Sequence, residues 1–100
     1  MGKTHVDGDF EWDDAKATRN YRKHHVRFEE AVTAFFDEHS MIVDDPQGHD
    51  DRFVLIGMSG EARVLYVVHA EVVTKRRTRI ISARIATKAE ALQYTLGDVE

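Results

Sequence analysis

Two neighbouring apolar stretches late in the sequence carry side chains that could transfer protons and bind a phosphate group. His69 and Glu71 are two residues apart, so they point to the same face of a strand. Ser82 and Arg84 share one face of the following stretch for the same reason, and Arg79 lies on that stretch too. Histidine and glutamate can act as acid or base, and the guanidinium of arginine binds two phosphate oxygens through parallel hydrogen bonds.

Whether these groups meet depends on the register of the hairpin that joins the two stretches. In one register His69 opposes Ser82, and Arg84 lies on the same face as both. A slip by one residue instead places Glu71 opposite Arg79. The sequence leaves both registers open.

Each candidate also has a purely structural explanation. Arg84 could form an ion pair at a sheet edge, and His69 could be half-buried and hydrogen-bonded within the sheet. Glu71 could pair across the hairpin with Arg79 or Arg77. The arrangement in space must decide between chemistry and architecture.

Three further candidates lie outside this pair of stretches. Lys23 and His24 stand at the predicted end of the first helix, where a positive charge interacts favourably with the helix dipole. Of these two, His24 is the stronger candidate for a functional site, because its pKa is ordinarily close to neutral pH. Tyr94 lies on the last predicted helix and is either an aromatic residue at the edge of the core or a catalytic phenol.

The composition indicates a single water-soluble domain without a metal or a cofactor. With 100 residues, of which 42% are apolar and 32% charged, we expect one domain over 1–100 with its core at about 10–96. Cysteine is absent, and the six histidines lack the spacing of metal ligands. No apolar run is long enough to cross a membrane and no secretory signal is evident, so we expect a cytoplasmic location.

Charge is distributed unevenly along the chain. The formal net charge of -4 argues mildly against binding to nucleic acid. Acidic residues concentrate in the stretch Asp44–Asp51, however, and basic residues concentrate between Lys75 and Arg84. A local basic surface is therefore compatible with the acidic total.

Hydrophobic periodicity predicts an α+β fold in which helices flank an antiparallel sheet. Asp13 suits the start of a helix that runs to about Lys23, and a second helix presents an apolar stripe from Phe28 to Phe36. Thr87 and Glu90 form a capping-box pattern that opens a last helix, which ends before Gly97. The predicted strands are Phe10–Trp12, Met41–Val43, Arg52–Met58, Val64–Val73 and Thr78–Ala86.

Three separated blocks of the sequence together resemble the BrnT family of toxins. The blocks are FEWDDAKATRNYRKHHVRFEEA, RFVLIGMS and RIISARIATKAEALQY, and they extend from Phe10 to Tyr94. The resemblance implies a RelE-like fold, in which a twisted antiparallel sheet of four to five strands carries two N-terminal helices and one C-terminal helix. It also implies a toxin of a bacterial type II toxin–antitoxin system that inhibits growth by cleaving RNA.

The resemblance further implies partners and a mechanism. The expected partner is a BrnA-like ribbon-helix-helix antitoxin, through which alone the toxin would reach operator DNA. RNA is the expected substrate, and no membrane is involved. Cleavage without a metal requires a base for the ribose 2′-OH, a cation for the crowded phosphate and an acid for the leaving 5′ oxygen.

The sequence departs from the family pattern at several positions. His25 stands where the family commonly has glycine, so it must adopt a left-handed conformation unless the turn differs. Ala70, Val72 and Ile85 replace polar or basic residues that the family often has near the presumed site. The alternative function is therefore that of a catalytically weak module that sequesters the antitoxin and tunes its operator binding.

Overall fold

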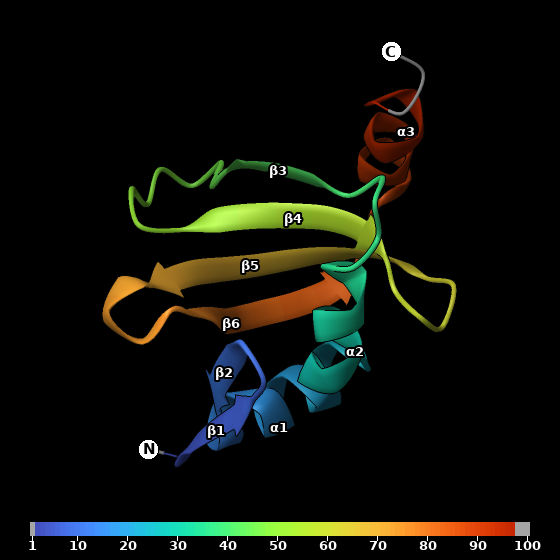
Figure 1. Ribbon diagram of the computed structural model, residues 1–100. Coiled ribbons are helices and arrows are strands. Elements are labelled where there is room, and N and C mark those ends of the chain that lie inside the picture. Colours follow the sequence, from blue (N-terminus) through green and yellow to red (C-terminus); the bar gives the residue numbers. More distant parts are fainter. Residues whose placement is uncertain (1, 98–100) are drawn as a thin grey trace.

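The computed structural model describes residues 2–97, which form one six-stranded mixed sheet and three α-helices (Figure 1). The sheet order is β1-β2-β6-β5-β4-β3. The strands are β1 Thr4–Asp7, β2 Phe10–Asp13, β3 Met41–Asp44, β4 Phe53–Met58, β5 Val64–Val72 and β6 Arg77–Ile85. The helices are α1 Asp14–His24, α2 Phe28–Ala34 and α3 Lys88–Gly97, and a short 3-10 turn covers Val73–Lys75.

The α+β class and the three helices are confirmed, but two features of the predicted sheet are wrong. The sheet has six strands because β1, which contains a single apolar residue, pairs with β2 to form an N-terminal hairpin. The sheet is also mixed, since β2 runs parallel to β6 through the pairs Phe10 with Thr78 and Glu11 with Arg79. Parallel pairing between strands this far apart in sequence leaves no local signal.

Helix α1 begins and ends where its sequence predicts. The Asp13 side chain accepts a hydrogen bond of 2.9 Å from the backbone N–H of Lys16, which caps the helix. At the other end His25 has φ 57° and ψ 31°, and its N–H donates to the Tyr21 carbonyl at 2.8 Å. The left-handed conformation expected at His25 is confirmed.

Helix α2 covers the main core. It is shorter than its apolar stripe, because the helix ends at Ala34 and the chain then turns. Phe35 packs at the edge of the core, whereas Phe36, the last residue of the predicted stripe, is 77% exposed. The core is formed by buried residues of the sheet, of α2 and of the segment that joins α1 to α2, namely Phe10, Trp12, Val26, Phe28, Ala31, Val32, Ala34, Leu55, Leu65, Val67, Ile80 and Ala83.

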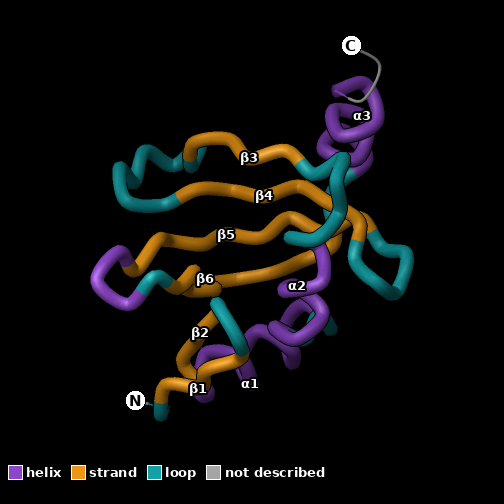
Figure 2. The backbone as a smooth tube through the Cα atoms, in the orientation of Figure 1, coloured by secondary structure: helices purple, strands orange, loops and turns teal. Residues whose placement is uncertain are grey.

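Strand β2 pairs with only the first part of β6, and helix α1 lies beside the part of β6 that follows (Figures 1 and 2). The buried amide of Asn20 accepts a hydrogen bond from the Ala83 N–H at 3.0 Å and donates to the Ala83 carbonyl at 2.8 Å. The same amide nitrogen donates to the Val26 carbonyl at 3.0 Å. Asn20 thus takes the place of a strand residue at this edge and positions the end of α1 next to β6.

The β5–β6 hairpin contains an irregularity that neither predicted register anticipates. From Leu65 to Val68 the pairing follows the second of the two registers, which places Tyr66 opposite Arg84. The register then shifts between Val68 and His69. Glu71 opposes Thr78 in consequence, rather than either residue that the predicted registers assign to it.

Helix α3 extends beyond the β3 end of the sheet (Figure 1). The Tyr94 hydroxyl donates to Asp37 Oδ2 at 2.5 Å, and the same oxygen accepts from the Met58 N–H at 2.8 Å. Asp37 therefore ties α3 to the end of β4. Among the described residues, no helix is long and apolar enough to cross a membrane.

Candidate functional site

A cavity of about 250 Å³ brings together three of the predicted site residues, His24, Ser82 and Arg84. Its walls come from the end of α1, from β5 and β6, and from the loop between β3 and β4. The contact between Asn20 and Ala83 is what places His24 there, since it holds α1 against the strand that carries Ser82 and Arg84. The remaining lining residues are Asp45, Gln47, Arg52, Tyr66, Val68 and Ile81.

Arg84 is the best-anchored cation in this cavity. Its guanidinium carbon lies 3.9 Å from the centre of the Tyr66 ring, directly across the hairpin. Its two terminal nitrogens donate to the two carboxylate oxygens of Glu90 at 2.7 Å and 2.9 Å. The guanidinium is thus held over an aromatic ring, and its two terminal nitrogens bind a carboxylate in the same way that arginine binds a phosphate.

His24 and Tyr66 have pKa values shifted in opposite directions. Partial burial lowers the pKa of His24, and the positive charges of Lys23 and Arg84 lower it further. Burial raises the pKa of the Tyr66 phenol, although the nearby Arg84 opposes this shift. At neutral pH, therefore, His24 is a neutral imidazole that can accept a proton and Tyr66 is a phenol that can donate one.

His69 does not join this group, because it lies on the opposite, core-facing side of the sheet. It is 2% exposed, its ring is 4.9 Å from that of Phe35, and its Nδ1 lies 3.3 Å from the Val67 carbonyl oxygen. Burial lowers the pKa of His69, so its imidazole stays neutral inside the core. This placement fits the structural explanation for His69.

Two other predicted residues, Glu71 and Arg79, bind partners outside the cavity. Glu71 is exposed near the hairpin turn and accepts a hydrogen bond of 3.0 Å from the Thr78 hydroxyl. Arg79 donates at 2.5 Å to Glu11, a carboxylate that is only 3% exposed and that Arg77 also contacts at 3.5 Å. Burial by itself would raise the pKa of Glu11, but Arg79 and then Arg77 lower it below its ordinary value. Arg79 thus neutralises a buried charge.

Of the remaining secondary candidates, Lys23 is exposed next to the cavity and Tyr94 lies away from it. Lys23 acts on the cavity through its charge, which lowers the pKa of His24. Tyr94 lies at the junction between α3 and β4, with Asp37. The structure therefore groups His24, Ser82 and Arg84, and separates them from His69, Glu71, Arg79 and Tyr94.

Sequence reasoning missed Tyr66, Arg52 and Glu90, which line the cavity or contact Arg84. The sequence does contain a signal for Tyr66. If the second hairpin register is continued along both strands, Tyr66 stands opposite Arg84. Glu90 was identified only as a capping residue, and it does cap: it accepts from the Thr87 N–H at 2.8 Å. For Arg52 the sequence gives no signal, since its position depends on the loop between β3 and β4.

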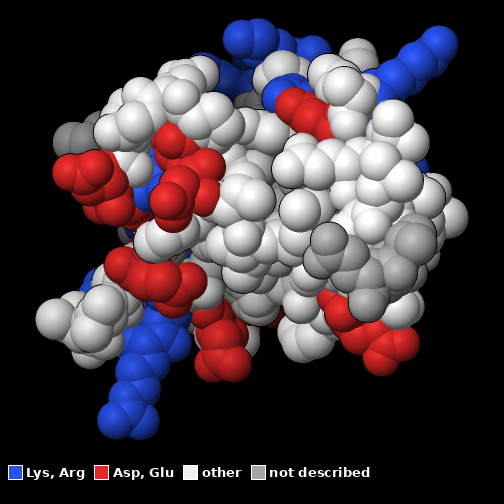
Figure 3. All heavy atoms as spheres, turned by 90° about the horizontal axis from the view of Figure 1, so that it is seen from above, with Lys and Arg blue, Asp and Glu red and all other residues white. Residues whose placement is uncertain are grey.

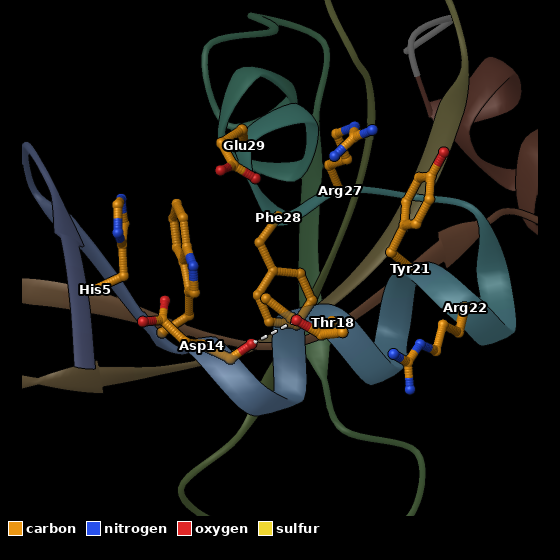
Figure 4. A pocket seen from close by; sticks show the side chains of 10 residues that line it. His5, Asp14, Thr18, Tyr21, Arg22, Arg27, Phe28 and Glu29 are labelled. Atoms are coloured by element: carbon orange, nitrogen blue, oxygen red, sulfur yellow. Dashed lines mark hydrogen bonds between the residues drawn. The ribbon is translucent and has the colours of Figure 1, made fainter. Parts of the chain in front are cut away.

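A second cavity, of about 380 Å³, lies between β1, α1 and the start of α2 (Figure 4). His5 stacks on Trp12 at one end, with ring centres 4.8 Å apart, and Arg27 lies over the Tyr21 ring at the other. Charges of both signs line this cavity, and it contains none of the predicted site residues. Within residues 2–97, no group of three or more His, Asp or Glu side chains is arranged to hold a metal ion.

Comparison with known proteins places this geometry in context. Residues 12–90 match the family model described as the ribonuclease toxin BrnT of type II toxin–antitoxin systems. No curated protein matches the sequence. Among solved structures, the ribonuclease toxin BrnT of Brucella abortus is similar, with a TM-score of 0.62 and 22% sequence identity over 77% of this chain and 94% of that one. That likeness confirms the fold.

Proposed function

Since the chain belongs to the BrnT family of ribonuclease toxins of type II toxin–antitoxin systems, we propose that it is an endoribonuclease whose active site is the cavity around Arg84. The observation that carries the proposal is the Arg84 guanidinium, stacked on Tyr66 and set beside His24. The substrate is RNA, and the proposed place of action is the cytoplasm.

The proposed reaction is attack of a ribose 2′-OH on the adjacent phosphorus. His24 takes the proton of the 2′-OH as the new P–O bond forms, and Tyr66 gives its proton to the 5′ oxygen as the P–O5′ bond breaks. Arg84 binds the non-bridging oxygens, on which charge accumulates. The products are a 2′,3′-cyclic phosphate and a free 5′-OH, and proton exchange with water restores both side chains. Side chains supply every proton transfer, so the reaction needs no metal.

The test is cleavage of RNA by the purified protein in the presence of EDTA. We expect the wild type to cut, and we expect Arg84→Gln to lower kcat by about 100-fold or more, as loss of a preorganised cation at the reacting phosphate does. Tyr66→Phe and His24→Gln remove one proton transfer each and should lower kcat by at least about 100-fold. Products that end in 2′,3′-cyclic phosphate would support attack by the 2′-OH.

Arg19→Gln is the matched control, because Arg19 is exposed on α1 outside the cavity. It changes the net charge as Arg84→Gln does and should cut normally. Equal cleavage by Arg84→Gln and wild type would refute the proposed site. Loss of cleavage in EDTA that added Mg²⁺ restores would refute the metal-independent mechanism.

One observation favours the second candidate function, a weak enzyme that acts mainly by holding its antitoxin. Both terminal nitrogens of Arg84 are already engaged by Glu90, so an RNA phosphate must compete with an internal carboxylate. Expression in a bacterial host separates the two functions. Growth arrest that the antitoxin reverses and that Arg84→Gln abolishes would favour the enzyme, whereas unimpaired growth would favour the binding module.

An antitoxin partner follows from the family, and we propose that it is a BrnA-like ribbon-helix-helix protein. Such a protein binds DNA through its own basic residues, so the toxin would reach operator DNA only through it. Co-purification of the two proteins, followed by a DNA-binding assay of the complex and of the toxin alone, tests this arrangement.

A further inference from the structure

Strand β3 forms one edge of the sheet and lies in the most acidic part of the chain. Residues 37–51 contain six of the eighteen Asp and Glu residues and none of the fourteen Lys and Arg residues. The central residue of the strand, Ile42, is 59% exposed. Edge strands are commonly protected by lysine or proline, because their unpaired backbone groups can bind another chain. β3 has neither residue, and no other strand within the described residues pairs with its outer edge.

An apolar groove continues this edge onto α3. It has a volume of about 470 Å³ and lies between Met41, at the start of β3, and the side chains of Leu92 and Leu96. Each of these two leucines is 57% exposed. Figure 3 looks down on this face: uncharged atoms occupy most of it, Asp and Glu side chains gather along its left margin, and Lys and Arg side chains appear towards its periphery.

We propose that the edge of β3 and the groove of α3 form one docking surface, and that its occupant is an extended segment of the antitoxin with apolar residues flanked by lysine or arginine. The segment adds a strand to β3, places apolar side chains against Met41 and Leu92, and sets its cations against the acidic stretch 37–51. The inference rests on the toxin–antitoxin part of the proposed function and not on RNA cleavage.

Electrostatics favours the antitoxin segment over two other occupants, a second copy of the chain and RNA. A second copy of the chain would pair β3 with β3 and bring two stretches of six acidic residues together, which like-charge repulsion opposes. RNA is disfavoured for the same reason, since its phosphates would face these carboxylates. A basic polypeptide is attracted to this face, and a protein that binds operator DNA carries the required positive charge.

The test measures the affinity of the purified chain for the antitoxin encoded beside its gene. Ile42→Lys places a charge on the exposed edge and should weaken binding by about tenfold or more, because a lysine there disfavours both strand pairing and a cationic partner. Val6→Lys is the matched control, since Val6 is 46% exposed on β1 at the opposite edge of the same sheet. It should bind like the wild type.

Charge and backbone pairing are tested separately. The triple variant Asp44→Asn, Asp50→Asn and Asp51→Asn should bind the antitoxin more weakly at low salt, and its affinity should depend less on the salt concentration. The double variant Asp7→Asn with Asp9→Asn should show neither change. Hydrogen exchange should show the amides of 41–44 protected in the complex. Equal affinity of Ile42→Lys and wild type, unprotected β3 amides, self-association through this face, or absence of any antitoxin binding would each overturn the proposal.

RNA cleavage by the free protein distinguishes this proposal from the proposed function. Ile42→Lys should cleave RNA at the wild-type rate, because Ile42 does not line the Arg84 cavity. A chain that fails to cut RNA but binds the antitoxin through β3 would leave the docking surface standing.

Discussion

At the scale of single residues, burial separates side chains of the same type into different roles. His24 and His69 both have lowered pKa values, and desolvation is the main cause in each. His24 nevertheless lines an open cavity beside Arg84, whereas His69 is enclosed by Phe35 and the sheet. Residue type alone makes both histidines candidates for a functional site, and only their packing in the structure distinguishes them.

The neutral state of His69 makes the stability of the fold depend on pH. The unfolded chain binds a proton at His69 near the ordinary pKa of 6.5, while the folded chain resists it, so the free energy of unfolding should decrease as the pH falls below about 6.5. In His69→Gln this decrease between pH 7 and pH 5 should be smaller. Urea unfolding at several pH values measures it.

His39→Gln is the control for the change of histidine to glutamine itself, because His39 is exposed. His24 contributes a change of the same sign, so the slope in His69→Gln should diminish and not vanish. An unchanged slope in that variant would show that His69 does not cause the effect.

At the scale of elements, what could be predicted were features that neighbouring residues determine. The cap at Asp13, the helical stripe from Phe28 and the capping box of Thr87 with Glu90 are local, and each appears in the structure. The bulge after Val68, the parallel pairing of β2 and the pairing of β1 depend on the assembled sheet. For that reason the sequence alone does not show which of the hairpin candidates lie on one face of the sheet.

The contact between α1 and β6 is the element-scale feature on which the candidate site depends most. Asn20→Ala would leave the Ala83 N–H, the Ala83 carbonyl and the Val26 carbonyl without their partner. Buried polar groups left unsatisfied cost about 1–3 kcal/mol each, so we expect the free energy of unfolding to fall by about 3 kcal/mol or more. Urea unfolding of the variant and the wild type measures this loss of stability.

Gln93→Ala on the exposed face of α3 is the control and should change stability by less than about 0.5 kcal/mol. RNA cleavage by folded Asn20→Ala should also decrease, because α1 no longer holds His24 against β6. A variant as stable and as active as the wild type would contradict the role given to Asn20.

At the scale of the whole molecule, the excess of negative charge comes from one stretch of the chain, residues 37–51. Without residues 37–51 the remainder of the chain has more Lys and Arg than Asp and Glu, although the full chain has a net charge of -4. The acidic loop also reaches the candidate active site, since Asp45 and Gln47 line its cavity. The same carboxylates should therefore attract a basic antitoxin and repel RNA.

This arrangement predicts opposite effects of one variant on two ligands. Neutralising Asp44, Asp50 and Asp51 to asparagine should lower the KM for RNA by about twofold to threefold at low salt while leaving kcat unchanged, because the repulsion acts on approach. Steady-state cleavage at two salt concentrations measures the change. The Asp7 and Asp9 variant serves as control, and a KM that responds equally in both variants would refute a local effect of the loop.

The parallel pairing of β2 with β6 also determines the order in which the protein can fold. Glu11 pairs with Arg79, so this contact can form only after the start of β6 has been made. The β3–β4–β5–β6 meander consists of neighbours in sequence and can form first, whereas β2 and α1 can dock onto the sheet only once β6 is present. On the ribosome, the helix that carries His24 can therefore dock only after β6 has been made, so the cavity around Arg84 is not assembled before that point.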